Sequence, residues 1–122
     1  MIHAVLRYGL SPEERLRKGK EIRAVCDRGR KIVAGCFVLL YRENGETFDR
    51  LGTIASRKIG NHPERNRAKR LLREVFRRNK PRLESGYDLV IIARYKIKGA
   101  TYHSLNAEFL SCLNKAELIR SE

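Results

Sequence analysis

The sequence predicts an α+β fold, a two-layer α/β sandwich in which about three helices pack on a small mixed sheet. Three observations support this class. Two apolar runs are rich in β-branched and aromatic residues, three other segments repeat apolar residues at helical spacing, and the expected order is helix, hairpin, basic helix, strand, helix. The 122 residues suit one domain, residues 1–122, which removes roughly two thirds of its unfolded surface from water.

A first helix is expected close to the N-terminus. An N-cap, a first-turn proline and a capping-box acid predict its start, at Ser11, Pro12 and Glu14. Gly29 ends it, because glycine favours the position just after a helix. Gly19 interrupts this pattern, so the alternative is a helix that begins near Lys20 and carries one apolar face, Ile22, Val25 and Cys26.

A hairpin is expected next. Residues 32–41 are too few and too rich in β-branched and aromatic side chains for a helix, and Asn44-Gly45 is a strong turn signal. We therefore expect residues 32–41 to pair through this turn with a strand over residues 51–57. Residues 87–94 form a third strand. A last helix then places five apolar side chains on one side, Leu105, Phe109, Cys112, Leu113 and Ala116.

The positive charge is concentrated between the second and third strands. The chain has a net charge of +13, and residues 57–82 hold eleven of its 27 lysines and arginines but only two acids, a local charge of 11 − 2 = +9. Such a block repels itself in the folded state, so a polyanion is the expected partner. Nucleic acid is the first candidate.

The same block has the pattern of an amphipathic helix, with Pro63 in its first turn and Pro81 limiting its end. One stripe is apolar: Ala68, Leu71, Leu72, Val75 and Phe76. Asn66, Arg70, Arg73 and Arg77 lie about opposite, with Lys69 and Lys80 on one flank and Arg67 and Arg78 on the other. A solvated charged face is the ordinary explanation for such a pattern. Here, however, Glu74 is the only acid spaced to pair with Arg70 and Arg78, so we interpret the polar side as a nucleic-acid contact.

Other classes of site find little support in the sequence. The three cysteines, Cys26, Cys36 and Cys112, fit neither a zinc pattern nor a full set of disulfides, so we expect reduced thiols in a cytoplasmic protein. The longest uncharged run is about half of a membrane span, and no membrane association is expected. The aspartates are scattered over different predicted elements, at Asp27, Asp49 and Asp88, and the histidines are similarly separate, at His3, His62 and His103. A two-metal or acid–base nuclease centre is therefore not predicted.

Two neighbouring motifs carry a family resemblance. The first is Ser56-Arg57-Lys58-Ile59-Gly60-Asn61, and the second is Arg65-Asn66-Arg67-Ala68-Lys69-Arg70-Leu71-Leu72-Arg73. Together they resemble the signature of the protein subunit of bacterial ribonuclease P. The resemblance extends over about residues 15–116, through Phe37-Val38-Leu39, Gly52 and the run from Asp88 to Arg94.

The resemblance implies a small basic protein that joins a catalytic RNA and assists removal of the 5′ leader from precursor tRNA. The RNA carries the chemistry, Mg²⁺ is expected in the RNA-containing holoenzyme, and neither a cofactor bound by the protein alone nor a protein partner is required. The implied left-handed β-α-β crossover disagrees with the general preference for right-handed connections, and we follow the resemblance. The RNA-binding residues expected from the charge block and the motif match are Arg57, Lys58, Asn61, Arg65, Asn66, Arg67, Lys69, Arg70, Arg73 and Arg77.

The resemblance also implies a cleft for the single-stranded leader between the first helix and the sheet. The resemblance implies aromatic rings there, whereas the matching positions in this chain are Ile22, Cys26 and Leu40, with a basic rim from Arg23, Arg28 and Lys31. Stacking on a ring is worth about 1 to 3 kcal/mol per base, so the missing rings weaken the expected contact. Phe37 is expected in the core, on the face opposite Leu40. The alternative function is a ribosomal protein or general RNA chaperone without a role in cleavage.

Overall fold

The structure is a computed structural model that describes residues 12–17 and 19–119. Its helices are α2 (Gly19–Arg28), α3 (His62–Asn79) and α4 (Tyr102–Ala116). Its strands are β1 (Arg30–Val33), β2 (Phe37–Glu43), β3 (Arg50–Ile54) and β4 (Tyr87–Ala93). Three short 3₁₀ turns are η1 (Pro12–Glu14), η2 (Lys80–Arg82) and η3 (Tyr95–Gly99). The α+β class with a small mixed sheet and three helices is therefore confirmed.

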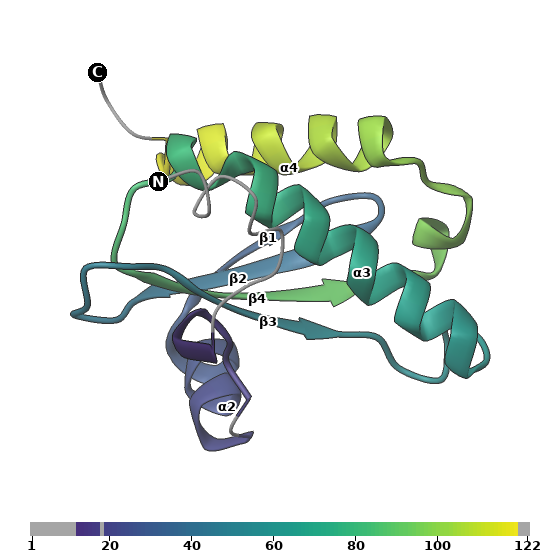
Figure 1. The fold of residues 1–122 in the computed structure, drawn as a ribbon, viewed down its shortest axis with the longest axis horizontal. Coiled ribbons are helices and arrows are strands. Elements are labelled where there is room, and N and C mark those ends of the chain that lie inside the picture. Colours follow the sequence, from purple (N-terminus) through teal and green to yellow (C-terminus); the bar gives the residue numbers. More distant parts are fainter. Residues whose placement is uncertain (1–11, 18, 120–122) are drawn as a thin grey trace.

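The four strands form one sheet in the order β1-β2-β4-β3. The pairs β1/β2 and β2/β4 are antiparallel, whereas β3 and β4 are parallel neighbours joined through α3. Figure 1 shows α3 and α4 lying along one face of the sheet and α2 on the opposite face. The basic helix is thus held against the sheet by its apolar side, with its polar side turned outward.

The predicted hairpin between residues 32–41 and 51–57 is wrong, because β4 lies between β2 and β3. The Asn44-Gly45 turn does form, with Gly45 at φ +76°, but the Asn44 amide donates to the carbonyl oxygen of Gly86 and so joins the turn to the start of β4. β4 is apolar on both faces, with Leu89, Val90 and Ile91 fully buried. Such a strand gains most from a central place in the sheet.

The single strand expected over residues 32–41 is two strands, β1 and β2, joined by a tight turn around Gly35. The first helix follows the alternative start: α2 begins at Gly19, and Pro12–Glu14 form only a 3₁₀ turn. The expected N-cap Ser11 lies outside the described residues. Gly29 ends α2 as predicted, and a Cβ atom there would meet two backbone oxygens at 2.5 and 2.7 Å. Only glycine fits where α2 passes into β1.

Two apolar clusters hold the layers together. The larger cluster lies between the sheet and the pair α3 and α4, and it contains the apolar stripes that the sequence predicted for both helices. Phe37 is 1 % exposed and packs on Phe109, with ring centroids 6.5 Å apart. The smaller cluster joins α2 to the other face of the sheet through Leu16, Val25, Leu40 and Val90. Apolar side chains fill both faces of the sheet, so the positive side chains of α3 lie on the side of the helix that faces away from the sheet.

Candidate nucleic-acid interface

The signature loop and the start of α3 are held by a capping box. The Asn61 side chain accepts a hydrogen bond from the Glu64 amide at 3.0 Å, and the Glu64 carboxylate accepts one from the Asn61 amide at 2.8 Å. The bond from the Asn61 backbone lowers the pKa of Glu64. Ile59 is buried at the centre of the loop, whereas Arg57 and Lys58, which directly precede it, are exposed. The loop therefore presents two cations from a fixed backbone.

The outer side of α3 carries positive charge that the described part of the chain does not neutralise. No ion pair joins Arg65, Lys69, Arg70 or Arg73 to any acid among residues 12–17 and 19–119. Partial burial and the nearby charges of Arg15 and Arg70 lower the pKa of Arg73. Arg15 therefore belongs to this cluster, although its place in the sequence, outside the basic block, does not indicate it. Several guanidinium groups that repel one another are a surface suited to phosphate groups.

Three other predicted contacts have partners inside the protein. Arg67 donates from Nη2 to the Ala100 carbonyl oxygen at 3.2 Å, and Asn66 lies 3.1 Å from the His62 ring. Arg77 donates to Glu74 at 2.6 Å, with only 16 % of its side chain exposed. Glu74 also accepts from Arg78 at 2.8 Å but forms no ion pair with Arg70, although both arginines are four residues away from it. Glu74 thus bonds with Arg77 and Arg78, which follow it on the helix, whereas Arg70 is exposed on the outer face.

The predicted leader-cleft residues lie together at the α2 side of the sheet. Leu40 is 6 % exposed and belongs to the smaller cluster, with Ile22 and Cys26 half-buried against it and Arg23 exposed at the surface of α2. These four positions are therefore adjacent in space, but Leu40 is covered by the helix. Its burial makes it a support for α2 more than an open contact surface.

A row of aliphatic side chains lies on the same face of the sheet as α2, next to the smaller cluster. It runs across all four strands in register, through Val33, Val38, Ile92 and Ile54. Val33 is 56 % exposed and the other three are half-buried. The sequence pattern did not single out this row, because the register that aligns these residues depends on the strand order.

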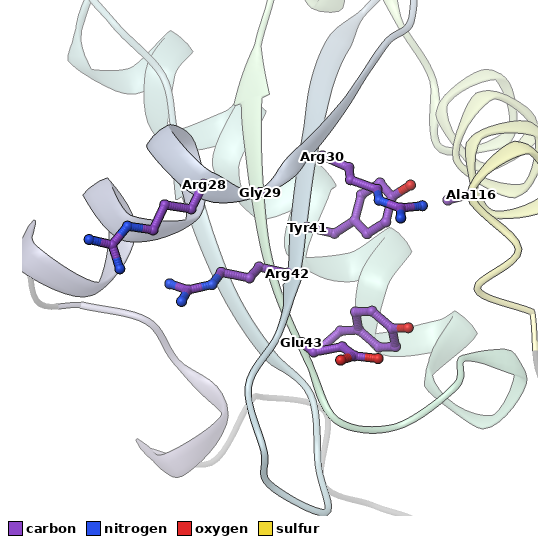
Figure 2. Close-up of a pocket in the computed structure, with 8 residues that line it drawn as sticks. Arg28, Gly29, Arg30, Tyr41, Arg42, Glu43 and Ala116 are labelled. Atoms are coloured by element: carbon purple, nitrogen blue, oxygen red, sulfur yellow. The ribbon is translucent and has the colours of Figure 1, made fainter.

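Three arginines, of which only Arg28 was expected at the cleft rim, line a pocket of about 510 Å³ at the opposite end of the sheet. They are Arg28, Arg30 and Arg42, with Tyr41 and Tyr87 nearby (Figure 2). In Figure 2, Arg28 and Arg42 lie on one side of β2 and Arg30 lies beside Tyr41 on the other. These arginines come from three separate elements, so no local charge block marks them in the sequence.

The cysteines and the acids provide no other centre. Cys36 and Cys112 are buried, Cys26 is half-buried, and all three thiols are free. Burial and a hydrogen bond with Glu108 raise the pKa of Cys36 to about 11. Within the described ranges, no group of three histidines, cysteines or acids is placed to hold a metal ion. In that same part of the chain, no helix has the length and apolar character needed to cross a membrane.

Comparison with known proteins agrees with this geometry. The Ribonuclease P family model matches residues 10–117. The ribonuclease P protein component of Natranaerobius thermophilus is 37 % identical over 105 residues, which cover 86 % of this chain and 91 % of the relative. That of Thermotoga maritima is 40 % identical over 84 residues, which cover 69 % of this chain and 72 % of the relative.

Two solved structures share the fold. The ribonuclease P protein of Thermotoga maritima has a TM-score of 0.76 at 34 % identity, covering 84 % of this chain and 96 % of that one. The protein from Staphylococcus aureus has a TM-score of 0.79 at 27 % identity, covering 88 % and 98 %. The match extends over the basic helix, the loop before it and the whole sheet, and the chain belongs to the bacterial ribonuclease P protein family.

Proposed function

We propose that this chain binds the catalytic RNA of ribonuclease P through the outer side of α3 and the loop before it. Members of the family assist an RNA subunit in removing the 5′ leader of precursor tRNA, so the chain is the non-catalytic protein part of an endoribonuclease. The observation that carries the proposal is a set of cations, Arg65, Lys69, Arg70 and Arg73, that form no ion pair with an acid of the described residues and lie on a helix whose other side is fixed in the core. Forked guanidinium groups on such a support can bind successive phosphates.

The precursor tRNA leader has a separate surface in this proposal, on the α2 side of the sheet. Leu40 is buried, so the leader crosses the aliphatic row of Val33, Val38, Ile92 and Ile54, with Ile22 and Cys26 at the edge of α2. Arg23 is exposed at the surface of α2, where a cation can meet the leader backbone. Apolar contact without rings is tolerant of base identity, because it makes no hydrogen bonds to base edges.

The holoenzyme of this proposal contains Mg²⁺ held by phosphate oxygens of the RNA, which are the hard ligands that this ion prefers. The protein contributes positive charge and positioning, and it binds no cofactor by itself. It acts in the cytoplasm, together with precursor tRNA and the catalytic RNA, and no further protein is required.

The test is reconstitution of the holoenzyme. Purified protein, a ribonuclease P RNA of several hundred nucleotides and a precursor tRNA are combined, and removal of the leader is followed at low Mg²⁺, with and without protein. We expect the protein to increase cleavage, and to increase it more for substrates with leaders of several nucleotides than for those with one. Equal affinity for unrelated structured RNAs, without an effect on cleavage, would indicate a general RNA chaperone. Cleavage by the protein without the RNA subunit would contradict the proposal.

A further inference from the structure

Tyr95 is the exposed aromatic side chain of the described residues. It is 66 % exposed, whereas the other described phenylalanine and tyrosine rings are buried or half-buried. Its segment, η3, is nonetheless firmly held: Ile97 is fully buried, and Ala100, at the end of the turn, is 6 % exposed. Arg94, directly before the ring, donates to the Ala34 carbonyl oxygen at 2.6 Å. The ring is thus presented to solvent by a fixed backbone and not by a loose loop.

A chain of contacts links this ring to the start of the basic helix. The Lys98 ammonium lies 5.1 Å from the centroid of the Tyr95 ring and 3.3 Å from the Glu64 carboxylate. Glu64 in turn closes the capping box with Asn61. Arg67 of the same helix donates to Ala100, at the other end of η3. Tyr95 therefore lies beside the N-terminal end of α3, next to the signature loop.

The surroundings of the ring suit an unpaired nucleobase. A cation over one face of a tyrosine ring leaves the opposite face open, and a base stacks on such a face irrespective of its identity. The Lys98 ammonium is close enough to bind a phosphate of the same nucleotide. Ile22, Cys26 and Leu40, on the α2 side of the sheet, carry no aromatic ring, so Tyr95 offers a stacking surface that those positions do not.

We propose that Tyr95 is a stacking platform for one unpaired nucleotide of the bound RNA, with Lys98 beside its phosphate. This inference rests on the proposed function, because it requires an RNA that lies along the outer side of α3. The nucleotide can come from the leader of precursor tRNA or from a single-stranded segment of the catalytic RNA. Both sources offer the same chemistry, a base with a free face and a neighbouring phosphate.

The chain contains no tryptophan, which allows a direct probe. Tyr95→Trp introduces a single indole at the platform, and Phe48→Trp introduces one in the loop between β2 and β3, away from η3. Each variant is titrated with the catalytic RNA, and the assembled holoenzyme is then titrated with precursor tRNA and with mature tRNA. We expect emission from Tyr95→Trp to be quenched in one of these steps and emission from Phe48→Trp to stay unchanged. Quenching by the catalytic RNA identifies that RNA as the source, and quenching by precursor but not mature tRNA identifies the leader.

Binding measurements complete the test. Tyr95→Ala should weaken the step that quenches by about 5- to 150-fold, the range for loss of one base stacked on a ring, while Tyr95→Phe stays within about twofold of the original protein. Because the side chain is exposed, both variants should keep the melting temperature. Full affinity of Tyr95→Ala in both steps, or unchanged emission from Tyr95→Trp in both, overturns the platform. A failure of the unmodified protein to bind the catalytic RNA instead overturns the proposed function. Binding of the unmodified protein is therefore measured before any variant is compared with it.

Discussion

Exchange of Arg70 for glutamine should weaken RNA binding and at the same time stabilise the folded protein. Arg70 is exposed, has no ion pair with a described acid, and is one of the charges that lower the pKa of Arg73. Each phosphate contact contributes about 0.7 to 0.9 to the slope of log affinity against log salt concentration. Loss of one contact should therefore reduce the slope by that amount and the affinity by about sixfold at 0.1 M salt. Arg70→Gln and Arg73→Gln together should reduce the slope by about 1.4 to 1.8.

The stability change has the opposite sign. Arg70 and Arg73 are three residues apart on α3, and a like-charge pair at this spacing costs about 0.2 to 0.5 kcal/mol. Glutamine has a similar helix propensity to arginine, so Arg70→Gln should relieve this repulsion and raise the melting temperature by about 1 to 3 °C. The measurements are a salt series of RNA affinities and a thermal unfolding curve.

Arg78→Gln is the matched control, since it removes one exposed charge from the same helix. Arg78 donates to Glu74 at 2.8 Å, and its guanidinium lies 4.7 Å from the centroid of the Tyr102 ring. Its loss should lower the melting temperature slightly and leave the salt slope unchanged. Equal changes in slope for Arg70→Gln and Arg78→Gln would refute the assignment of one RNA-binding side, because affinity would then follow total charge alone.

Three further predictions concern the framework around the interface. Gly29→Ala should destabilise the protein by about 1 to 3 kcal/mol in urea unfolding, because the new methyl group would lie 2.5 and 2.7 Å from two backbone oxygens. Gly99→Ala is the control and should change the stability little, because the new Cβ atom would have open space around it. Asp88→Asn should cost about 2 to 3 kcal/mol in the same assay, since it breaks a paired contact with Arg50 at 2.8 Å on both oxygens, and a loss under about 0.5 kcal/mol would show that this ion pair adds little. Hydrogen bonds from Arg77 and Arg78 lower the pKa of the Glu74 carboxylate in the folded protein. The stabilisation that Glu74 contributes is therefore complete above its pKa in the unfolded chain, and it is lost as the pH falls through its lower pKa in the folded protein. Glu74→Gln should therefore lose less stability than the original protein between about pH 5 and pH 3, and an identical loss in the two proteins would count against this ion pair.

Local sequence patterns were sufficient for the elements whose signals lie within one segment. The apolar stripe of α3, its start near Pro63 and its end near Pro81 follow from helical spacing and from the backbone chemistry of proline. The end of α2 at Gly29 and the buried strand β4 have equally local causes. The family could also be identified from the two motifs around α3, because the order and spacing of their residues can be recognised in the sequence without knowledge of the fold.

Local patterns failed where two segments compete for the same neighbour. The Asn44-Gly45 turn predicts a hairpin, but β4 displaces β3 from the edge of β2, and the turn instead bonds to Gly86. Strand order depends on the sum of side-chain burial over both faces of the sheet, which no single turn reveals. The aliphatic row and the arginine pocket were missed for the same reason, since each combines residues from three or more elements.

The sequence by itself determined that the chain carries a basic amphipathic helix after a short signature loop, and hence its family and its RNA-binding character. The tertiary structure alone decided which of these cations have hydrogen-bond partners inside the protein. Arg67 and Arg77 have the same charge as Arg70, yet Arg67 donates to Ala100 and Arg77 to Glu74, whereas Arg70 remains on the outer face. A charge contributes to binding according to its partners and its exposure, and both are set by the packing of α3 against η3 and the sheet.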